Sequence, residues 1–339
     1  MYESSGILPF GPSRPMRIVD LDEWHDAAPE SVQRVARDAQ SELSLTVGVA
    51  TRRPPAHLRP LWQALTVALA GPGTGVPDRC FVSVPDCEEA LAKVVRTVRH
   101  QPQACVALGQ LLRQTSHLDI LPGLAAEAAV YSMLLSGTEF HAWLADRGAP
   151  RTAVTSERPL VRLHRDESRL SVVLDHPERR NALSFGMREA LFEALETAVI
   201  DDIIAEVDLS GAGPAFCSGG DLAEFGTAND LVAAYLVRLD RAPWRLIARI
   251  HERVNVRVHG AAVGAGIEMA AFARRVVAAP DTFFLLPEAS MGLVPGAGGT
   301  VSVSRRIGRW RTAWMVLSGE NVDSATALAW GLVDEITPP

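Results

Sequence analysis

Residues 256–300, VRVHGAAVGAGIEMAAFARRVVAAPDTFFLLPEASMGLVPGAGGT, hold the strongest structural signal in this sequence. They read as an apolar strand, a turn rich in glycine and alanine, and a helix with Glu268 near its start. A second glutamate, Glu288, follows just before another glycine-rich turn at 296–299. Two carboxylates, each beside a backbone turn, form an acid/base site next to N–H donors. The segment therefore predicts an active site.

Composition narrows the class of protein. The chain has 339 residues, of which 47% are apolar and 22% charged, as in a globular protein with a substantial core and one to three domains. Its net charge of −7 argues against nucleic acid as a partner. No apolar run approaches the roughly 20 residues of a membrane span, and the first residues lack a secretory pattern. We therefore expect a cytoplasmic enzyme with no membrane partner.

Cysteine usage bears on metals and disulfides. The four cysteines are scattered, with no CxxC pair and no histidine pair nearby: Cys80, Cys87, Cys105 and Cys217. This spacing predicts neither a disulfide framework nor a zinc site. We expect no metal, and we interpret Cys217 as a buried structural thiol because no histidine lies near it in sequence. His259 follows a strand and faces either the core or the site.

The chain divides near residue 150. We expect residues 1–150 to form a mainly helical region and 149–158 to form a linker without periodicity. The elements expected before the linker are a helix over 28–43, a strand over 45–51, an amphipathic helix over 58–70, a short strand within 79–86, and helices from 87 to 147.

After the linker, strands alternate with helices. Residues 159–176 read as a β-hairpin, and 184–201 as an amphipathic helix with Ser184 as its N-cap. Further strands are expected at 205–211, 255–263, 273–279 and 282–287. This alternation predicts an α/β fold with a largely parallel sheet and crossover connections.

Three motifs in order carry a resemblance to a known family: HPERRNALS at 176–184, GAGPAFCSGGDLAEF at 211–225 and GAAVGAGIEMA at 260–270. With these, residues 159–336 resemble the enoyl-CoA hydratase/isomerase (crotonase) superfamily. The resemblance implies a ClpP/crotonase-like catalytic core that acts on acyl-CoA thioesters. Coenzyme A would then be part of the substrate, with no separate cofactor, and the expected assembly is a homotrimer or a dimer of trimers.

The resemblance also implies roles for particular residues. Gly220 and Ala265 match the two backbone N–H donors of the oxyanion hole, and Asn181 and Ala182 match the segment whose backbone contacts the adenine end of CoA. Proton transfer at Cα places charge on the thioester oxygen, and losing one oriented donor to that oxygen typically costs about 3–4 kcal/mol. Asp221 is expected to cap the helix that follows.

Glu268 and Glu288 stand where hydratases of this family carry their two glutamates. The resemblance assigns Glu288 to the proton at Cα and Glu268 to the water at Cβ, whereas simple isomerases usually keep only the equivalent of Glu288. Hydration of a 2-enoyl-CoA is therefore the leading function. The alternatives are double-bond isomerisation, another enolate reaction such as thioester hydrolysis or decarboxylation, and a non-catalytic subunit that keeps the fold.

The chain departs from the family in the order of its parts. Family members continue into C-terminal helices after a segment like GLVDEITPP (331–339), whereas here similar helices, with an xGLxxEx pattern, precede the core at 87–147. These helices belong either to a degenerate crotonase-like copy or to an unrelated helical domain. We assign residues 1–150 a structural role that covers the core. The basic segment RRIGRWR (305–311) either meets CoA phosphates, forms a solvated face or contacts another subunit.

Overall fold

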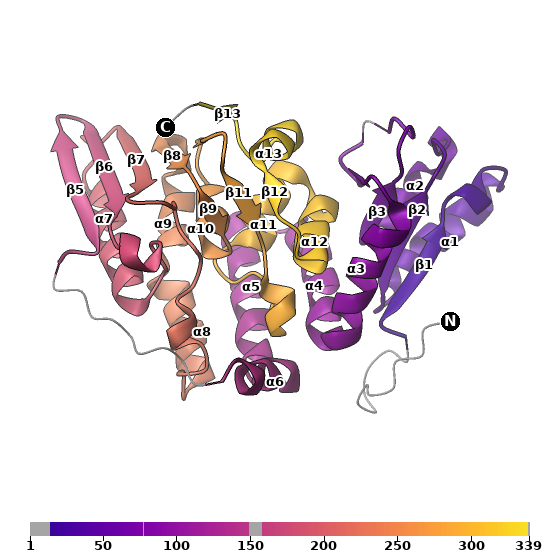
Figure 1. Cartoon of the computed structure of the whole chain (residues 1–339), viewed down its shortest axis with the longest axis horizontal. Helices are drawn as coiled ribbons and strands as arrows, with labels where there is room; N and C mark the ends of the chain where they lie inside the picture. The colour runs from indigo at the N-terminus through magenta and orange to yellow at the C-terminus, as the bar shows by residue number, and fades with distance from the viewer. Residues whose placement is uncertain (1–13, 77, 149–157, 338–339) are drawn as a thin grey trace.

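The computed structural model describes residues 14–76, 78–148 and 158–337 of the chain (Figure 1). The expected linker therefore lies almost wholly outside the described residues. Two largely parallel sheets stand at opposite ends of the molecule, with a layer of helices between them (Figure 1). Helices from both halves of the sequence form that layer, so the division near residue 150 is a division of the sequence and not of the hydrophobic core.

A six-stranded sheet organises the second half of the chain, in the order β13-β10-β8-β7-β6-β5. Its strands are β5 (Val161–Asp166), β6 (Arg169–Leu174), β7 (Glu206–Gly211), β8 (Val254–Val258), β10 (Arg275–Ala278) and β13 (Glu335–Ile336). Only β5 is antiparallel, because it forms the predicted hairpin with β6. The prediction of a largely parallel sheet is confirmed.

A smaller sheet positions the glycine-rich turns. It contains β9 (Ala261–Val263), β11 (Phe283–Leu285) and β12 (Val322–Asp323), and β9 runs parallel to β11. The helices of this half are α7 (Phe185–Ile200), α8 (Leu231–Asp240), α9 (Pro243–Arg249), α10 (Ala265–Ala270), α11 (Gly299–Ile307), α12 (Arg309–Ser318) and α13 (Ser324–Trp330). Ser184 caps α7 as predicted, because its hydroxyl accepts a hydrogen bond from the Met187 N–H.

The N-terminal region contains a parallel sheet that the sequence only half revealed. Its four strands are β1 (Met16–Asp20), β2 (Leu45–Ala50), β3 (Val67–Ala70) and β4 (Phe81–Ser83), with α1 (Pro29–Ser41) and α2 (Arg59–Ala64) on one face. The strands expected at 45–51 and 79–86 are present. The helix expected over 58–70 is wrong in its second half, because α2 ends at Ala64 and β3 follows. All four residues of β3 are buried, and a short apolar run buried on both faces has no period that separates strand from helix.

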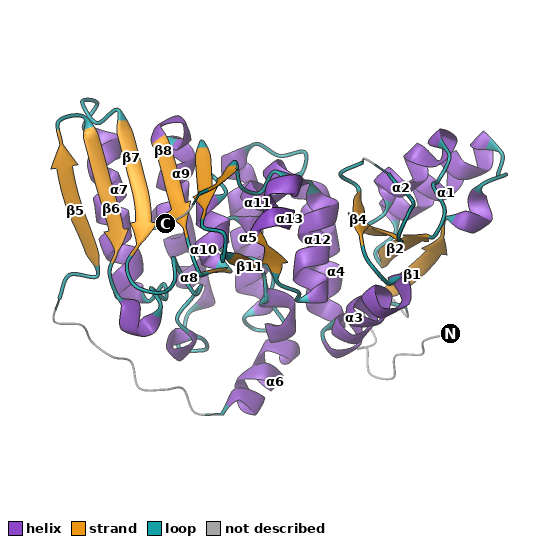
Figure 2. Cartoon of the chain, turned by 45° about the horizontal axis from the view of Figure 1, so that its top comes forward, coloured by secondary structure: helices purple, strands orange, loops and turns teal. Residues whose placement is uncertain are grey.

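Helices α3 (Cys87–His100), α4 (Pro102–Thr115) and α5 (Ile120–Leu134) lie between the two sheets, and α6 (Thr138–Arg147) lies below them at the lower edge of the molecule (Figure 2). Helix α3 packs on α12, α4 packs on α11 and α12, and α5 packs on α8 and α11. They precede the core in sequence yet cover it in space. Among the described residues, no single helix is long and apolar enough to cross a membrane; α5 and α6 meet that test only as a pair bent by 63°.

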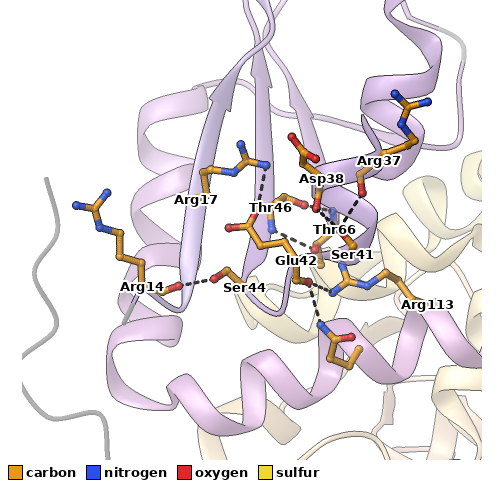
Figure 3. A network of polar contacts seen from close by, with 11 residues as sticks. Arg14, Arg17, Arg37, Asp38, Ser41, Glu42, Ser44, Thr46, Thr66 and Arg113 are labelled. Atoms are coloured by element: carbon orange, nitrogen blue, oxygen red, sulfur yellow. Dashed lines mark hydrogen bonds and ion pairs between the residues drawn. The ribbon is translucent and has the colours of Figure 1, made fainter. Parts of the chain in front are cut away.

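Polar contacts join the N-terminal sheet to the helical layer (Figure 3). Arg113 on α4 donates to the Glu42 carbonyl oxygen at 3.0 Å, and Gln110 donates to the same oxygen at 3.2 Å. The Glu42 side chain pairs with Arg17 of β1 at 2.9 Å. The short segment between α1 and β2 is therefore held from both sides.

Candidate active site

Glu268 lies in α10, the short helix that begins at the glycine-rich turn after β9. Its side chain is 2% exposed, and Oε2 accepts hydrogen bonds from the backbone N–H groups of Ala297 at 2.7 Å and Gly299 at 2.9 Å. Burial raises the pKa of Glu268, and these donors oppose that rise. The two N–H groups stabilise the charged carboxylate against its burial.

Glu288 directly follows β11 and the pair Leu286-Pro287, at the start of a single helical turn. It is 6% exposed, and its Oε2 has no hydrogen-bond partner in the described part of the chain. Burial first, and then the charge of Glu268, raise the pKa of Glu288 well above its ordinary value. A buried carboxyl group in which one oxygen lacks a donor favours its neutral form, so Glu288 is suited to hold a proton that it can donate.

Gly264 brings the two carboxyl groups to one place. Its φ is +48°, and a Cβ atom there would lie 2.7 Å from Oε1 of Glu288 and 3.9 Å from Oε1 of Glu268. Glycine is required both by the backbone conformation and by the closeness of the Glu288 oxygen. The two glutamates singled out in the sequence therefore face the same small volume.

The two expected oxyanion donors lie on adjacent turns. A Cβ atom on Gly219 would lie 3.0 Å from the Val263 carbonyl oxygen, so the turn that carries Gly220 abuts the turn that carries Ala265. Both residues line one cavity, and within the described residues neither N–H donates to a protein acceptor. Ala265 is the first residue of α10, and its φ is not positive. Alanine can therefore adopt this backbone conformation and present its N–H to the cavity without strain.

A third buried carboxylate, Glu127, reaches the site from α5 of the N-terminal region. Its Oε1 accepts from the Gly298 N–H at 2.6 Å, and its Oε2 accepts from the N–H and the hydroxyl of Thr300 at 2.8 and 2.6 Å. Burial and then the charge of Glu268 raise the pKa of Glu127, and its three donors oppose the rise. Along the turn at 297–300, successive backbone N–H groups therefore donate alternately to Glu268 and to Glu127. Glu127 thus helps to position the turn whose N–H groups bind Glu268.

These groups open on a cavity of about 1160 Å³. Its aromatic lining comes from both halves of the chain: Tyr131, Phe140 and Trp143 from α5 and α6, and Phe185, Phe225 and Trp244 from the core. A largely apolar cavity of this size with a few convergent polar groups is typical of a small-molecule site. Within the described residues, no group of three or more His, Cys, Asp or Glu side chains is arranged to hold a metal ion.

Three arginines place positive charge in the same cavity: Arg188, Arg238 and Arg241. Arg238 of α8 lies 4.0 Å from the centre of the Tyr131 ring and donates to the Gly296 carbonyl oxygen at 3.0 Å. Its charge lowers the pKa of Glu268, against the larger effect of burial. Arg188 lies near it, and its Nε has no hydrogen-bond partner in the described part of the chain. The field of these arginines favours the ionised form of a neighbouring carboxylate.

Asn181 and Ala182 lie outside this cavity. Asn181 is fully buried with φ +53°, and its side-chain amide accepts from the His176 N–H and donates to three backbone carbonyls, those of Ala212, Ala215 and Phe216. The side chain therefore holds the turn that leads into Gly219 and Gly220. The expected contact of this backbone with CoA stays a prediction.

The remaining candidates take structural places. Cys217 is buried, and burial raises the pKa of its thiol to about 12, so it is no nucleophile near neutral pH. His259 lies outside the cavity with its Nε2 2.8 Å from the Gly213 carbonyl oxygen. Asp221 caps the turn after Gly220, as predicted, by accepting from the Ala223 N–H at 3.0 Å.

The purely structural role expected for residues 1–150 is too narrow, because α5 and α6 supply Glu127 and part of the cavity wall. One local signal was present. Glu127 is the only charged residue in α5, a helix that is otherwise apolar, and a lone carboxylate on such a helix is rarely buried without donors. Nothing local indicated Arg238, whose helix has no fully buried residue.

Comparisons with known proteins agree with this geometry. The family model described as "Enoyl-CoA hydratase/isomerase" matches residues 165–339. A 2,3-dehydroadipyl-CoA hydratase from Escherichia coli is 34% identical over 174 residues, which cover 51% of this chain and 68% of that protein. A 1,2-epoxyphenylacetyl-CoA isomerase from the same organism is 32% identical over 178 residues, with coverage of 51% and 68%.

Solved structures give the same result for the core. The crystal structure of an enoyl-CoA hydratase from Mycobacterium smegmatis matches 54% of this chain and 71% of its own, with 33% sequence identity and a TM-score of 0.50. The similarity spans about half of the present chain.

Proposed function

This chain belongs to the enoyl-CoA hydratase/isomerase family, and from that premise we propose that it adds water across the C2=C3 double bond of a 2-enoyl-CoA thioester. The chain is an enzyme of this family. The proposal concerns which of the family's reactions it performs and which residues carry the reaction.

One observation supports hydration above the alternatives: two buried glutamates share one volume but have opposite surroundings. Glu268 accepts two backbone hydrogen bonds, which favour its carboxylate form. Glu288 has an oxygen with no donor, which favours its neutral form. One base and one acid on the same face of a substrate are what the addition of water requires.

In the proposed reaction the thioester oxygen accepts hydrogen bonds from the N–H groups of Gly220 and Ala265. Glu268 takes a proton from a water molecule while the water oxygen forms a bond to Cβ. The π electrons of C2=C3 move into the enolate, whose charge rests on the thioester oxygen. Glu288 then gives its proton to Cα, and a proton passes from Glu268 to Glu288 to restore the starting state.

The test compares hydration with proton exchange in the Glu268→Ala variant. Incubation of the wild type with short and branched 2-enoyl-CoAs should remove the conjugated thioester absorbance. Glu268→Ala should lower that rate by about 10²–10⁴ because its base is missing, while exchange of the Cα proton in deuterated water, which needs Glu288 alone, is retained. Glu252→Ala, at an exposed position, is the matched control.

Double-bond isomerisation is the second candidate, because the matched family is described as containing enoyl-CoA isomerases as well as hydratases. A 1,3-proton shift needs only one carboxyl group, for which Glu288 suffices. Conversion of 3-enoyl-CoA to 2-enoyl-CoA, without hydration of any substrate in the panel, would establish the isomerase and refute the hydratase. Binding of acyl-CoA without either reaction would favour another enolate chemistry.

A further inference from the structure

A second cavity, of about 840 Å³, lies between the N-terminal sheet and the core. It shares no lining residue with the cavity that holds the glutamates. Its walls come from α1 and α2, from the loop before β4, and from α4, α11 and α12. The basic segment at 305–311 supplies Arg305, Arg309 and Trp310 to this cavity and nothing to the first.

The lining of this cavity is strongly basic. Four arginines line it, Arg79, Arg113, Arg305 and Arg309, and none of the described lining residues is acidic. Each of the four guanidinium groups donates hydrogen bonds to backbone carbonyl oxygens, which orient a guanidinium without neutralising it. Two acids lie near these arginines outside the lining: Glu42 already pairs with Arg17, and Asp78, next to Arg79 in sequence, accepts hydrogen bonds from the Cys80 N–H and the Trp62 side chain. Burial and then the charge of Arg113 lower the pKa of Arg309 to about 10.

Three buried polar atoms of the lining have no partner in the described chain. They are Nη1 of Arg113, Oγ of Ser304 and Nε1 of Trp310. Buried donors are nearly always paired in native proteins, so three unpaired ones around a single cavity indicate a missing acceptor. All three can donate to an oxyanion.

We propose that this cavity is an anion site, separate from the acyl-CoA site, that binds a small molecule carrying a diphosphate group. A diphosphate supplies several oxygens at a geometry that guanidinium groups match in pairs. Four arginines around so large a volume exceed what one chloride or one carboxylate requires. The bound anion joins the N-terminal sheet, α4 and the α11–α12 corner.

The test uses the full-length protein at constant ionic strength, because exposed arginines are screened by salt. Pyrophosphate, ADP, inorganic phosphate and adenosine are titrated by calorimetry and by thermal unfolding, with sodium chloride as the reference. Saturable binding of pyrophosphate with one site per chain is expected, together with a rise in Tm. If ADP binds more tightly than pyrophosphate, the ligand is a nucleotide. If ADP and pyrophosphate bind with equal affinity and adenosine does not bind, the site recognises the diphosphate group alone.

Two variants and one control make the test specific. Arg113→Gln removes a charged donor and should weaken pyrophosphate binding about tenfold or more. Trp310→Phe keeps the aromatic ring and deletes only an N–H that has no protein partner, so it should fold normally and weaken binding about threefold to tenfold. Arg162→Gln removes an exposed arginine of β5, paired with Asp175, and should leave binding unchanged.

Three results overturn the proposal. One is stabilisation by pyrophosphate no greater than by chloride at equal ionic strength. Another is an equal response of Arg113→Gln and Arg162→Gln, which would indicate nonspecific attraction. The third is a rise in the KM for acyl-CoA that parallels the loss of pyrophosphate binding in Trp310→Phe, which would make the cavity part of the substrate site.

Discussion

This chain contains two glycine-rich segments, one in each region, and their surroundings differ. In GPGTG (71–75), after β3, a Cβ atom on Gly73 would meet nothing within 4 Å. In GAGGT (296–300), a Cβ atom on Gly298 would lie 2.3 Å from the Phe272 ring, and one on Gly299 would lie 2.8 Å from Cγ of Glu268. Gly73 and Gly298 both have positive φ. A glycine with positive φ therefore does not by itself indicate a functional site. The distinguishing feature of the segment at 296–300 is that a buried carboxylate lies against it.

The same contrast holds for the two sheets. The N-terminal sheet is covered on both faces, by α1 and α2 on one side and by the helical layer on the other, and none of the described residues of its loops is a buried acid. The core places Glu268 and Glu288 just after its strand β9 and its strand β11. Both regions thus have an α/β construction, but only the core brings two buried glutamates to one cavity.

The largest expected effect comes from separating the regions. Expression of residues 155–339 removes α3–α6 and should give insoluble protein or protein that binds a hydrophobic dye strongly, without activity, because α11 and α12 lose their cover. Residues 87–339 keep those helices and should give more soluble protein. A well-behaved, active 155–339 fragment would show that the two regions are independent.

Next in size is the effect of Glu288→Gln on turnover. The variant keeps the shape of the side chain and loses the proton donor, so kcat should fall by about 10²–10⁴ while acyl-CoA still binds. Glu88→Gln, in the first turn of α3, is the control in the N-terminal region and should turn over normally. Turnover like that of the wild type in folded Glu288→Gln would remove this glutamate from the mechanism.

The two glycine segments can be compared by stability. Gly298→Ala meets both a φ of +102° and the Phe272 ring, so it should lower the free energy of unfolding by about 3 kcal/mol or more. Gly73→Ala has only a φ of +80° to accommodate and should cost about 1 kcal/mol. Denaturant titration measures both, and equal losses would contradict the distinction between a crowded and an open turn.

The smallest effect is a pH dependence of stability. Burial raises the pKa of Glu288 in the folded state, so this group stabilises the fold while it is protonated and that contribution is lost as pH rises above its unfolded value of about 4.3. Near pH 4, the Glu288→Gln variant should therefore have the same free energy of unfolding as the wild type. Near pH 8, the free energy of unfolding of the variant should be the higher of the two, by about 1.4 kcal/mol for each unit by which folding raises the pKa of Glu288. A variant less stable than the wild type at pH 8 would show that the carboxylate is stabilised in the fold.

Several elements were readable from the sequence because their causes are local. The Ser184 cap and the hairpin of β5 and β6 follow from turn chemistry and from period-two alternation within a few residues. The strand β3 was not readable, because Val67 and Leu69 pack in one hydrophobic cluster while Ala68 and Ala70 pack in another. Only the tertiary packing of both faces distinguishes that strand from the end of a helix.

The sequence by itself determined the order of the elements that form the candidate site: the glycine turns, the helix start at Ala265, and a glutamate beside each turn. These depend on backbone conformation over a few residues. Only the tertiary structure decided that Glu127 of α5 accepts hydrogen bonds from the turn at 298–300, although Gly298 lies 171 residues later in the chain. It also decided that four arginines from distant segments surround a second cavity. Contacts between residues so far apart arise from how helices and sheets pack, and no local pattern of hydrophobicity or charge encodes which faces will meet.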